Sequence, residues 1–195
     1  MSPASFPDFV KKNYEIREWK HASAILEKDF TDEWTDILDV LTKFRLRKSW
    51  LVVGGGGKSK ISSAIDKALY AKNWKEKSFF TSISIDEERH DTPTHKIDCY
   101  KNRIALEIEW NNKDPFFDRD LNNFRLLFDL RAISVGVIVT RSDELQDIFD
   151  NLGRGKSFGS STTHMSKLIP RIEGGGGGGC PILVIGITTK LYKED

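Results

Sequence analysis

Apolar residues recur along the chain with two spacings, and each spacing predicts a different kind of secondary structure. A repeat of three or four residues predicts amphipathic helices over 31–46, 60–69 and 118–128. Alternating or continuous apolar residues predict strands over 80–85, 97–101, 103–110, 132–140 and 181–188. This order predicts an α/β fold with a mixed central β-sheet flanked by helices on both faces. We expect one domain over residues 1–195, in which residues 1–30 form a loosely assigned N-terminal extension.

The strand predicted over 103–110 carries two carboxylates on one of its faces. The opposite face is apolar and consists of Ile104, Leu106, Ile108 and Trp110. Glu107 and Glu109 are two residues apart, so their Cα atoms lie about 7 Å from each other on the same side. Asp98, on the preceding segment, is close enough in sequence to fold back beside them. Such a group of acids needs a neutralising cation, and oxygen ligands suit a hard ion such as Mg²⁺. The alternative interpretation is an ordinary pair of solvated glutamates on an exposed strand face.

Asp98 followed by Glu107-Ile108-Glu109 resembles the active-site motif of the PD-(D/E)xK nuclease superfamily, and more narrowly the BglII/BstYI-like type II restriction endonucleases. The resemblance extends over most of the chain after Ser59. Its other matching segments are 71–76, 117–121, 133–137 and 181–187. Two positions depart from the superfamily pattern. Ile97 replaces the proline of the motif, and Glu109 stands where many such nucleases have lysine or glutamine.

The resemblance implies a restriction-endonuclease-like core and a Mg²⁺-dependent enzyme that cuts double-stranded DNA at a short, palindromic sequence and leaves 5′-phosphate ends. It implies that Asp98, Glu107 and the main-chain carbonyl of Ile108 bind the metal, and that Glu109 either accepts a proton from the attacking water or orients it. An enzyme with one active site per chain most simply cuts both DNA strands as a pair of chains, so we expect a homodimer.

Polar and basic side chains around this motif and in a long glycine-rich loop are candidate DNA contacts, because such groups bind phosphates or base edges. They are Lys58, Ser59, Asn111, Asn112, Arg154, Lys156, Ser160, Ser161, Thr162, Thr163 and His164. The alternatives are an ordinary solvated loop and, for His164, a residue that caps a helix.

A glycine run followed by Lys58 and Ser59 suggests a nucleotide-binding P-loop, but Val52 occupies the position where that motif needs its first glycine. We therefore expect no nucleotide cofactor and interpret the run Gly54–Gly57 as a connection before a helix. A second run, Gly174–Gly179, offers no side-chain chemistry. A nucleotide-binding protein and a non-catalytic DNA-binding module remain the alternative functions.

Composition excludes several other classes of protein. The 38% hydrophobic and 30% charged residues are typical of a globular chain, and no apolar run is long enough to span a membrane. The net charge of +1 argues against binding nucleic acid through bulk positive charge and leaves room for a localised basic cleft. The chain has 2 cysteines, too few for a disulfide framework, so we expect a reducing, cytoplasmic location without membrane contact.

Overall fold

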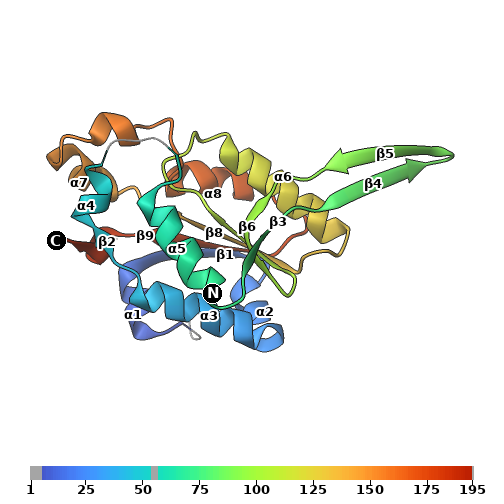
Figure 1. Cartoon of the computed structure of the whole chain (residues 1–195), viewed down its shortest axis with the longest axis horizontal. Helices are drawn as coiled ribbons and strands as arrows, with labels where there is room; N and C mark the ends of the chain where they lie inside the picture. The colour runs from blue at the N-terminus through green and yellow to red at the C-terminus, as the bar shows by residue number, and fades with distance from the viewer. Residues whose placement is uncertain (1–5, 54–56, 195) are drawn as a thin grey trace.

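A computed structural model describes residues 6–53 and 57–194. Its centre is a six-stranded sheet in which neighbouring strands come from distant parts of the chain (Figure 1). In order across the sheet, the strands are β1 (Tyr14–Trp19), β9 (Ile182–Ile187), β8 (Val135–Arg141), β7 (Ile104–Ile108), β6 (Ile97–Lys101) and β3 (Lys75–Lys77). β7, β8 and β9 are parallel, whereas β1, β6 and β3 pair antiparallel with their neighbours. The sheet is therefore mixed, as the sequence predicts.

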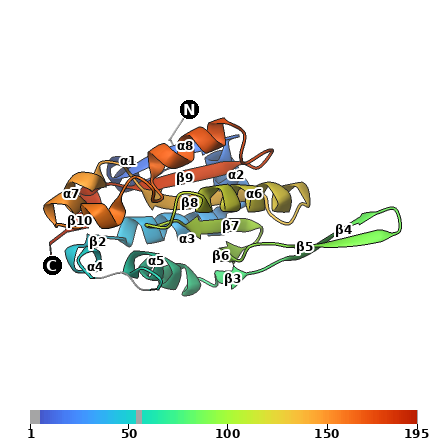
Figure 2. The ribbon, with the colours of Figure 1, turned by 90° about the horizontal axis from the view of Figure 1, so that it is seen from above.

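Helices cover both faces of this sheet (Figure 2). Each face has its own apolar core. One core joins the sheet to α1 (Asp8–Asn13), α2 (Ala22–Asp29), α3 (Thr31–Lys43), α4 (Lys48–Leu51), α5 (Lys60–Tyr70) and α7 (Leu145–Asn151). The other core joins it to α6 (Phe116–Asp129) and α8 (Met165–Glu173). Short elements complete the described chain: β2 (Leu46–Arg47), β10 (Tyr192–Lys193) and the 3₁₀ turns Gly155–Phe158 and Thr189–Leu191.

β7 has the alternation that its sequence predicts. Ile104, Leu106 and Ile108 belong to the larger core, whereas Ala105 belongs to the core beneath α6. Glu107 therefore also points towards α6. Because β7 lies between β6 and β8 and α6 covers it, this face is closed to solvent, unlike the exposed strand face of the alternative interpretation.

The N-terminal segment contributes a strand that the sequence analysis did not predict. β1 pairs antiparallel with β9 along its whole length, from Tyr14 opposite Ile187 to Trp19 opposite Ile182. The helices α1 and α2 flank this strand, and their residues Val10 and Leu26 are fully buried in the larger core. Residues 6–30 are therefore an integral part of the sheet and its covering layer.

A two-stranded ribbon projects from the body between β3 and β6 (Figures 1 and 2). It consists of β4 (Phe80–Ile85), a strand that the sequence predicts, and its antiparallel partner β5 (Glu88–Pro93). At its base, the Thr94 hydroxyl donates to the Phe79 carbonyl and accepts from the Phe79 amide. Among the described residues, none of the helices has both the length and the apolar character needed to cross a bilayer.

Candidate functional site

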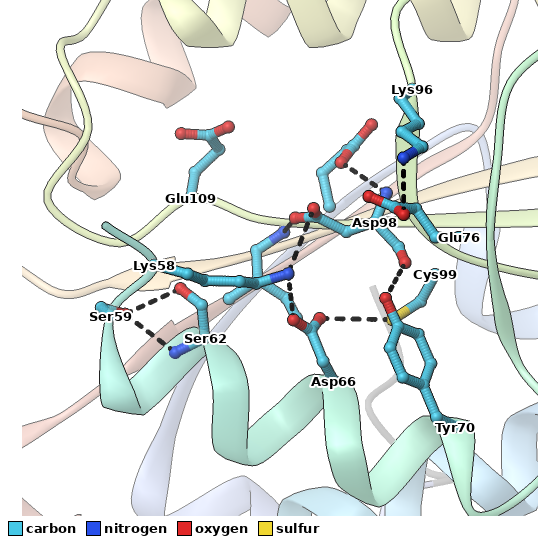
Figure 3. A network of polar contacts seen from close by, with 12 residues as sticks. Lys58, Ser59, Ser62, Asp66, Tyr70, Glu76, Lys96, Asp98, Cys99 and Glu109 are labelled. Atoms are coloured by element: carbon cyan, nitrogen blue, oxygen red, sulfur yellow. Dashed lines mark hydrogen bonds and ion pairs between the residues drawn. The ribbon is translucent and has the colours of Figure 1, made fainter.

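A tight turn between β6 and β7 brings Asp98 beside Glu107. Asn102 and Arg103, which form the turn, both have positive φ, 42° and 68°. Across the hairpin, the main-chain N–H of Asp98 donates to Oε2 of Glu107 at 3.1 Å. In return, Oδ2 of Asp98 accepts from the main-chain N–H of Ile108 at 3.1 Å (Figure 3). The first two acids of the predicted motif are therefore adjacent and fixed by the backbone.

The two acids differ in their exposure to solvent. The Asp98 side chain is 27% exposed, whereas the Glu107 residue is only 1% exposed. Burial, together with the nearby charges of Asp120 and Asp98, raises the pKa of Glu107 well above its ordinary value. Oε1 of Glu107 is buried without a hydrogen-bond partner in the described part of the chain. Such an atom is costly unless a proton, a water molecule or a cation approaches it.

Glu109 is held by residues that follow it in the chain. Its Oε2 accepts a hydrogen bond from Asn112 Nδ2 at 2.7 Å, and its Oε1 lies 3.2 Å from Arg119 Nη2. The same Arg119 nitrogen lies 2.8 Å from Oδ1 of Asp120, which is fully buried on α6. Burial raises the pKa of both acids, and that of Asp120 rises further because Glu109 is negatively charged. The orientation of Glu109 is thus fixed at both oxygens.

The sequence analysis expected the three acids to lie close together, and Asp98 and Glu109 line one cleft. Within residues 6–53 and 57–194, no three or more His, Cys, Asp or Glu side chains are arranged to hold a metal ion. The Glu109 carboxylate points away from Asp98 (Figure 3). Asn112 and Arg119 satisfy its two oxygens. Asp98 and Glu107, with the unpaired Oε1 of Glu107, still offer the oxygen donors that a hard divalent cation prefers. This pair fits such an ion better than the trio does.

A fifth acid, Asp66 on α5, lies near Asp98, with the ammonium group of Lys58 between them. Lys58 Nζ is ion-paired with Oδ2 of Asp66 and lies 3.7 Å from Oδ1 of Asp98. Asp66 also accepts a weak hydrogen bond from the thiol of Cys99 on β6 at 3.5 Å. Burial raises the pKa of Asp66, and Lys58 opposes that rise. The hydroxyl of Ser59 caps α5 by accepting from the Ser62 amide, which fixes where this helix begins.

The sequence analysis missed Asp66 and Asp120, although the sequence contains a signal for both. Each acid lies within the apolar face of a helix, Asp66 next to Ile65 and Asp120 next to Leu121. A charged residue in such a face is rarely buried without a partner. This position would have been reason to search for partners on the neighbouring strands.

A cleft of about 700 Å³ opens beside these acids. Asp98 and Glu109 line it, together with the Ile108 residue whose carbonyl was predicted as a ligand. Five of the predicted DNA-contact residues also line the cleft, namely Lys58, Ser59, Asn111, Asn112 and Arg154. The structure therefore gathers segments before α5, after β7 and after α7 around one opening.

The remaining predicted DNA contacts lie outside the cleft lining, and three of them have roles within the fold. Thr163 is fully buried and its hydroxyl accepts from the Asn112 amide, while the Thr162 hydroxyl accepts from buried Arg141. His164 is buried at the start of α8, where its side chain makes no capping hydrogen bond and its Nε2 lies 3.5 Å from Asp143. The other three are exposed on the same loop: Lys156, Ser160 and Ser161.

The site as a whole combines acids at the wall of a cleft with cationic and amide side chains around its opening. These are groups that can hold a divalent cation and a phosphodiester side by side.

Comparison with family models shows that residues 14–187 match the family described as restriction endonuclease BglII/BglIII. The chain belongs to this family and is therefore a site-specific deoxyribonuclease. A search of curated proteins finds no match to the chain.

Proposed function

We propose that this chain is a Mg²⁺-dependent type II restriction endonuclease that hydrolyses both strands of a short palindromic DNA sequence and leaves 5′-phosphate ends. Enzymes of its family are typically metal-dependent and act on DNA. The observation that carries the proposal is the interlocked pair of Asp98 and Glu107, which combines a buried, unpaired carboxylate oxygen with an acid open to the cleft.

In this proposal, Asp98, Glu107 and the main-chain carbonyl of Ile108 hold the ion. Bound there, Mg²⁺ supplies a Lewis acid that lowers the pKa of a water molecule and offsets negative charge on the scissile phosphate. Glu109 lies on the cleft wall, where Asn112 and Arg119 fix its carboxylate. We assign Glu109 the role of either orienting the attacking water or accepting its proton. Asp120 helps to position Arg119, because the guanidinium group of Arg119 contacts the carboxylates of both Glu109 and Asp120.

The cleft has a mixed rim that suits a DNA backbone better than a free nucleotide. Lys58, Arg119 and Arg154 supply positive charge, and Asn111 and Asn112 supply amide groups that bind phosphates or base edges. Two chains related by a two-fold axis place one such cleft on each strand of a palindrome. We therefore propose a homodimer as the active form, which sedimentation would show as twice the mass of one chain.

The test is incubation of mixed plasmid and phage DNA with the protein in Mg²⁺ and, separately, in EDTA. Discrete bands in Mg²⁺ alone are expected for the natural chain, and intact DNA for Asp98→Asn. Asp147→Asn is the matched control, because Asp147 is exposed on α7 and does not line the cleft. Binding without cutting in any divalent metal would establish the non-catalytic DNA-binding alternative. ATP or GTP binding that Lys58→Ala abolishes would establish the nucleotide-binding alternative.

A further inference from the structure

Lys58 occupies an unusual position for a cleft lysine, because its ammonium group lies between two acids of the site. It reaches from the start of α5 towards Asp66 and Asp98 (Figure 3). Among the described residues, Lys58 alone has a charged nitrogen within 4.0 Å of an Asp98 carboxylate oxygen. Burial lowers the pKa of Lys58, but the hydrogen bond to Asp66 and the charge of Asp98 raise it to about 12. The group is therefore charged at physiological pH.

The ion pair with Asp66 accounts for only part of this arrangement. The Asp66 side chain is 4% exposed and needs a positive partner, because an unpaired buried charge is costly. The Lys58 side chain, however, is 44% exposed and lines the cleft, so the ammonium group is accessible to anything bound there. A lysine required only to pair with Asp66 has no need to lie on the cleft wall beside Asp98.

The ammonium group and a divalent cation compete for the same carboxylate. Asp98 is one of the acids that we assign to the metal, and a unit positive charge 3.7 Å from its Oδ1 opposes the approach of a second cation. A lysine side chain is a point charge on a flexible four-carbon stem, so it can change partners without rearrangement of the backbone. Gly57 precedes it at φ +87°, and a Cβ added there would have no described atom within 4 Å.

We propose that Lys58 exchanges partners during the reaction: it neutralises Asp66 and Asp98 in the metal-free chain, and it pairs with the scissile phosphate once a divalent cation binds to Asp98. This inference rests on the proposed nuclease function. The strand that carries Glu107, β7, has no cationic residue, and the residue that follows it is the acid Glu109, so positive charge at the phosphate comes from another element. Lys58 supplies it from the start of α5, and the anionic phosphate replaces the carboxylate as its partner.

Two measurements on Lys58→Met test this exchange. Without DNA, calorimetric titration with Ca²⁺ should show about tenfold tighter binding than in the natural chain, because a competing charge has been removed. With cognate DNA and saturating Mg²⁺, the single-turnover cleavage rate should fall by about 10²-fold, the usual effect of removing one group that stabilises transition-state charge. Lys67→Met is the matched control, because Lys67 is exposed on α5 and does not line the cleft, and this variant should change neither quantity.

Unchanged or weaker Ca²⁺ binding by Lys58→Met would overturn the competition with the metal. An unchanged cleavage rate at saturating Mg²⁺ would overturn the role at the phosphate. If Lys58→Met does not fold, Lys58→Gln and Lys58→Arg provide the same comparison, and the charge-retaining arginine variant should bind Ca²⁺ like the natural chain. If the natural chain cuts no DNA in any divalent metal, the proposed function fails, whereas the Ca²⁺ titration still decides whether Lys58 competes with the cation.

Discussion

Replacing Glu107 with glutamine should stabilise the metal-free protein while it abolishes DNA cleavage. Glu107 is buried, and its Oε2 accepts only the Asp98 amide among the described residues. Its Oε1 has no hydrogen-bond partner there, and the acids Asp98 and Asp120 lie close enough to raise its pKa. Glutamine keeps an acceptor for the Asp98 amide, removes a buried charge, and adds N–H donors that face acidic neighbours.

The magnitude follows from the cost of that buried oxygen. A buried polar atom without a partner costs about 1–3 kcal/mol, so the free energy of unfolding of Glu107→Gln should exceed that of the natural chain by about this amount at pH 8 in EDTA. For a chain of 195 residues, each kcal/mol corresponds to about 2–4 °C in Tm. A gain in stability at the cost of activity is common when charge is removed from an active site.

The sign of the pH dependence follows from the raised pKa. A carboxyl whose pKa is higher in the folded than in the unfolded state contributes stability fully below its unfolded pKa, and this contribution is lost as pH rises through the folded pKa. The unfolded value is near the ordinary 4.5 for glutamate. The natural chain should therefore lose stability relative to Glu107→Gln as the pH rises above this value, and the difference between them should nearly vanish in acid.

The assay is urea unfolding in EDTA at several pH values, combined with cleavage of DNA in Mg²⁺. Glu173→Gln is the matched control, because Glu173 is exposed at the end of α8, and its stability should follow the natural chain at every pH. A Glu107→Gln protein that is less stable than the natural chain at pH 8 would refute the reasoning, as would a stability difference that does not change with pH. Activity retained by this variant would instead count against Glu107 as a metal ligand.

Two further predictions concern packing and capping around the same site. At Gly136, an added Cβ would overlap the ring of buried Phe124, so Gly136→Ala should cost about 1–3 kcal/mol in urea unfolding. Gly159→Ala, whose nearest contact is 3.5 Å, should change stability by less than about 0.5 kcal/mol, and equal stabilities would contradict the packing argument. Ser59→Ala removes the acceptor for the Ser62 amide at 2.9 Å and should cost about 0.5–2 kcal/mol in the same assay. Ser59→Asp keeps an acceptor and should restore most of that loss, so a neutral Ser59→Ala would show that the cap is dispensable.

The fold was predictable where an element carries a regular apolar pattern. The helix expected over 31–46 is α3, Thr31–Lys43, and the continuous apolar segment 181–188 is β9. The N-terminal strand was not predictable in this way. Among the strands that the structure describes, β1 is at the edge of the sheet and pairs with β9 alone. Its sequence alternates weakly because Glu15, Arg17 and Glu18 accompany its apolar residues. Its partner lies at the other end of the chain, and no local pattern contains that pairing.

The second strand of the projecting ribbon was missed for a related reason. β5 is rich in charged residues, which have low strand propensity, and it is ordered by pairing with β4 and not by a core. The turn at Asp86, which adopts φ 53°, brings the two strands together. Pairing that depends on a partner strand and a turn leaves little trace in the hydrophobic pattern of either strand.

The acids of the site likewise divide into those that the sequence pattern reveals and those that it does not. Glu107 and Glu109 were found because they occupy alternate positions of one strand, opposite its apolar face. Their burial was not predicted, because it depends on α6 packing over that strand. Asp66 and Asp120 come from two different helices and meet the motif only in three dimensions. Together these contacts concentrate several carboxylates around two cations of the chain itself, Lys58 and Arg119. Because burial raises the pKa of Glu107, Glu109 and Asp120, we expect the metal-free fold to lose stability as the pH rises. Binding of a divalent cation should relieve this loss, so the same residues link the stability of the protein to the chemistry we propose.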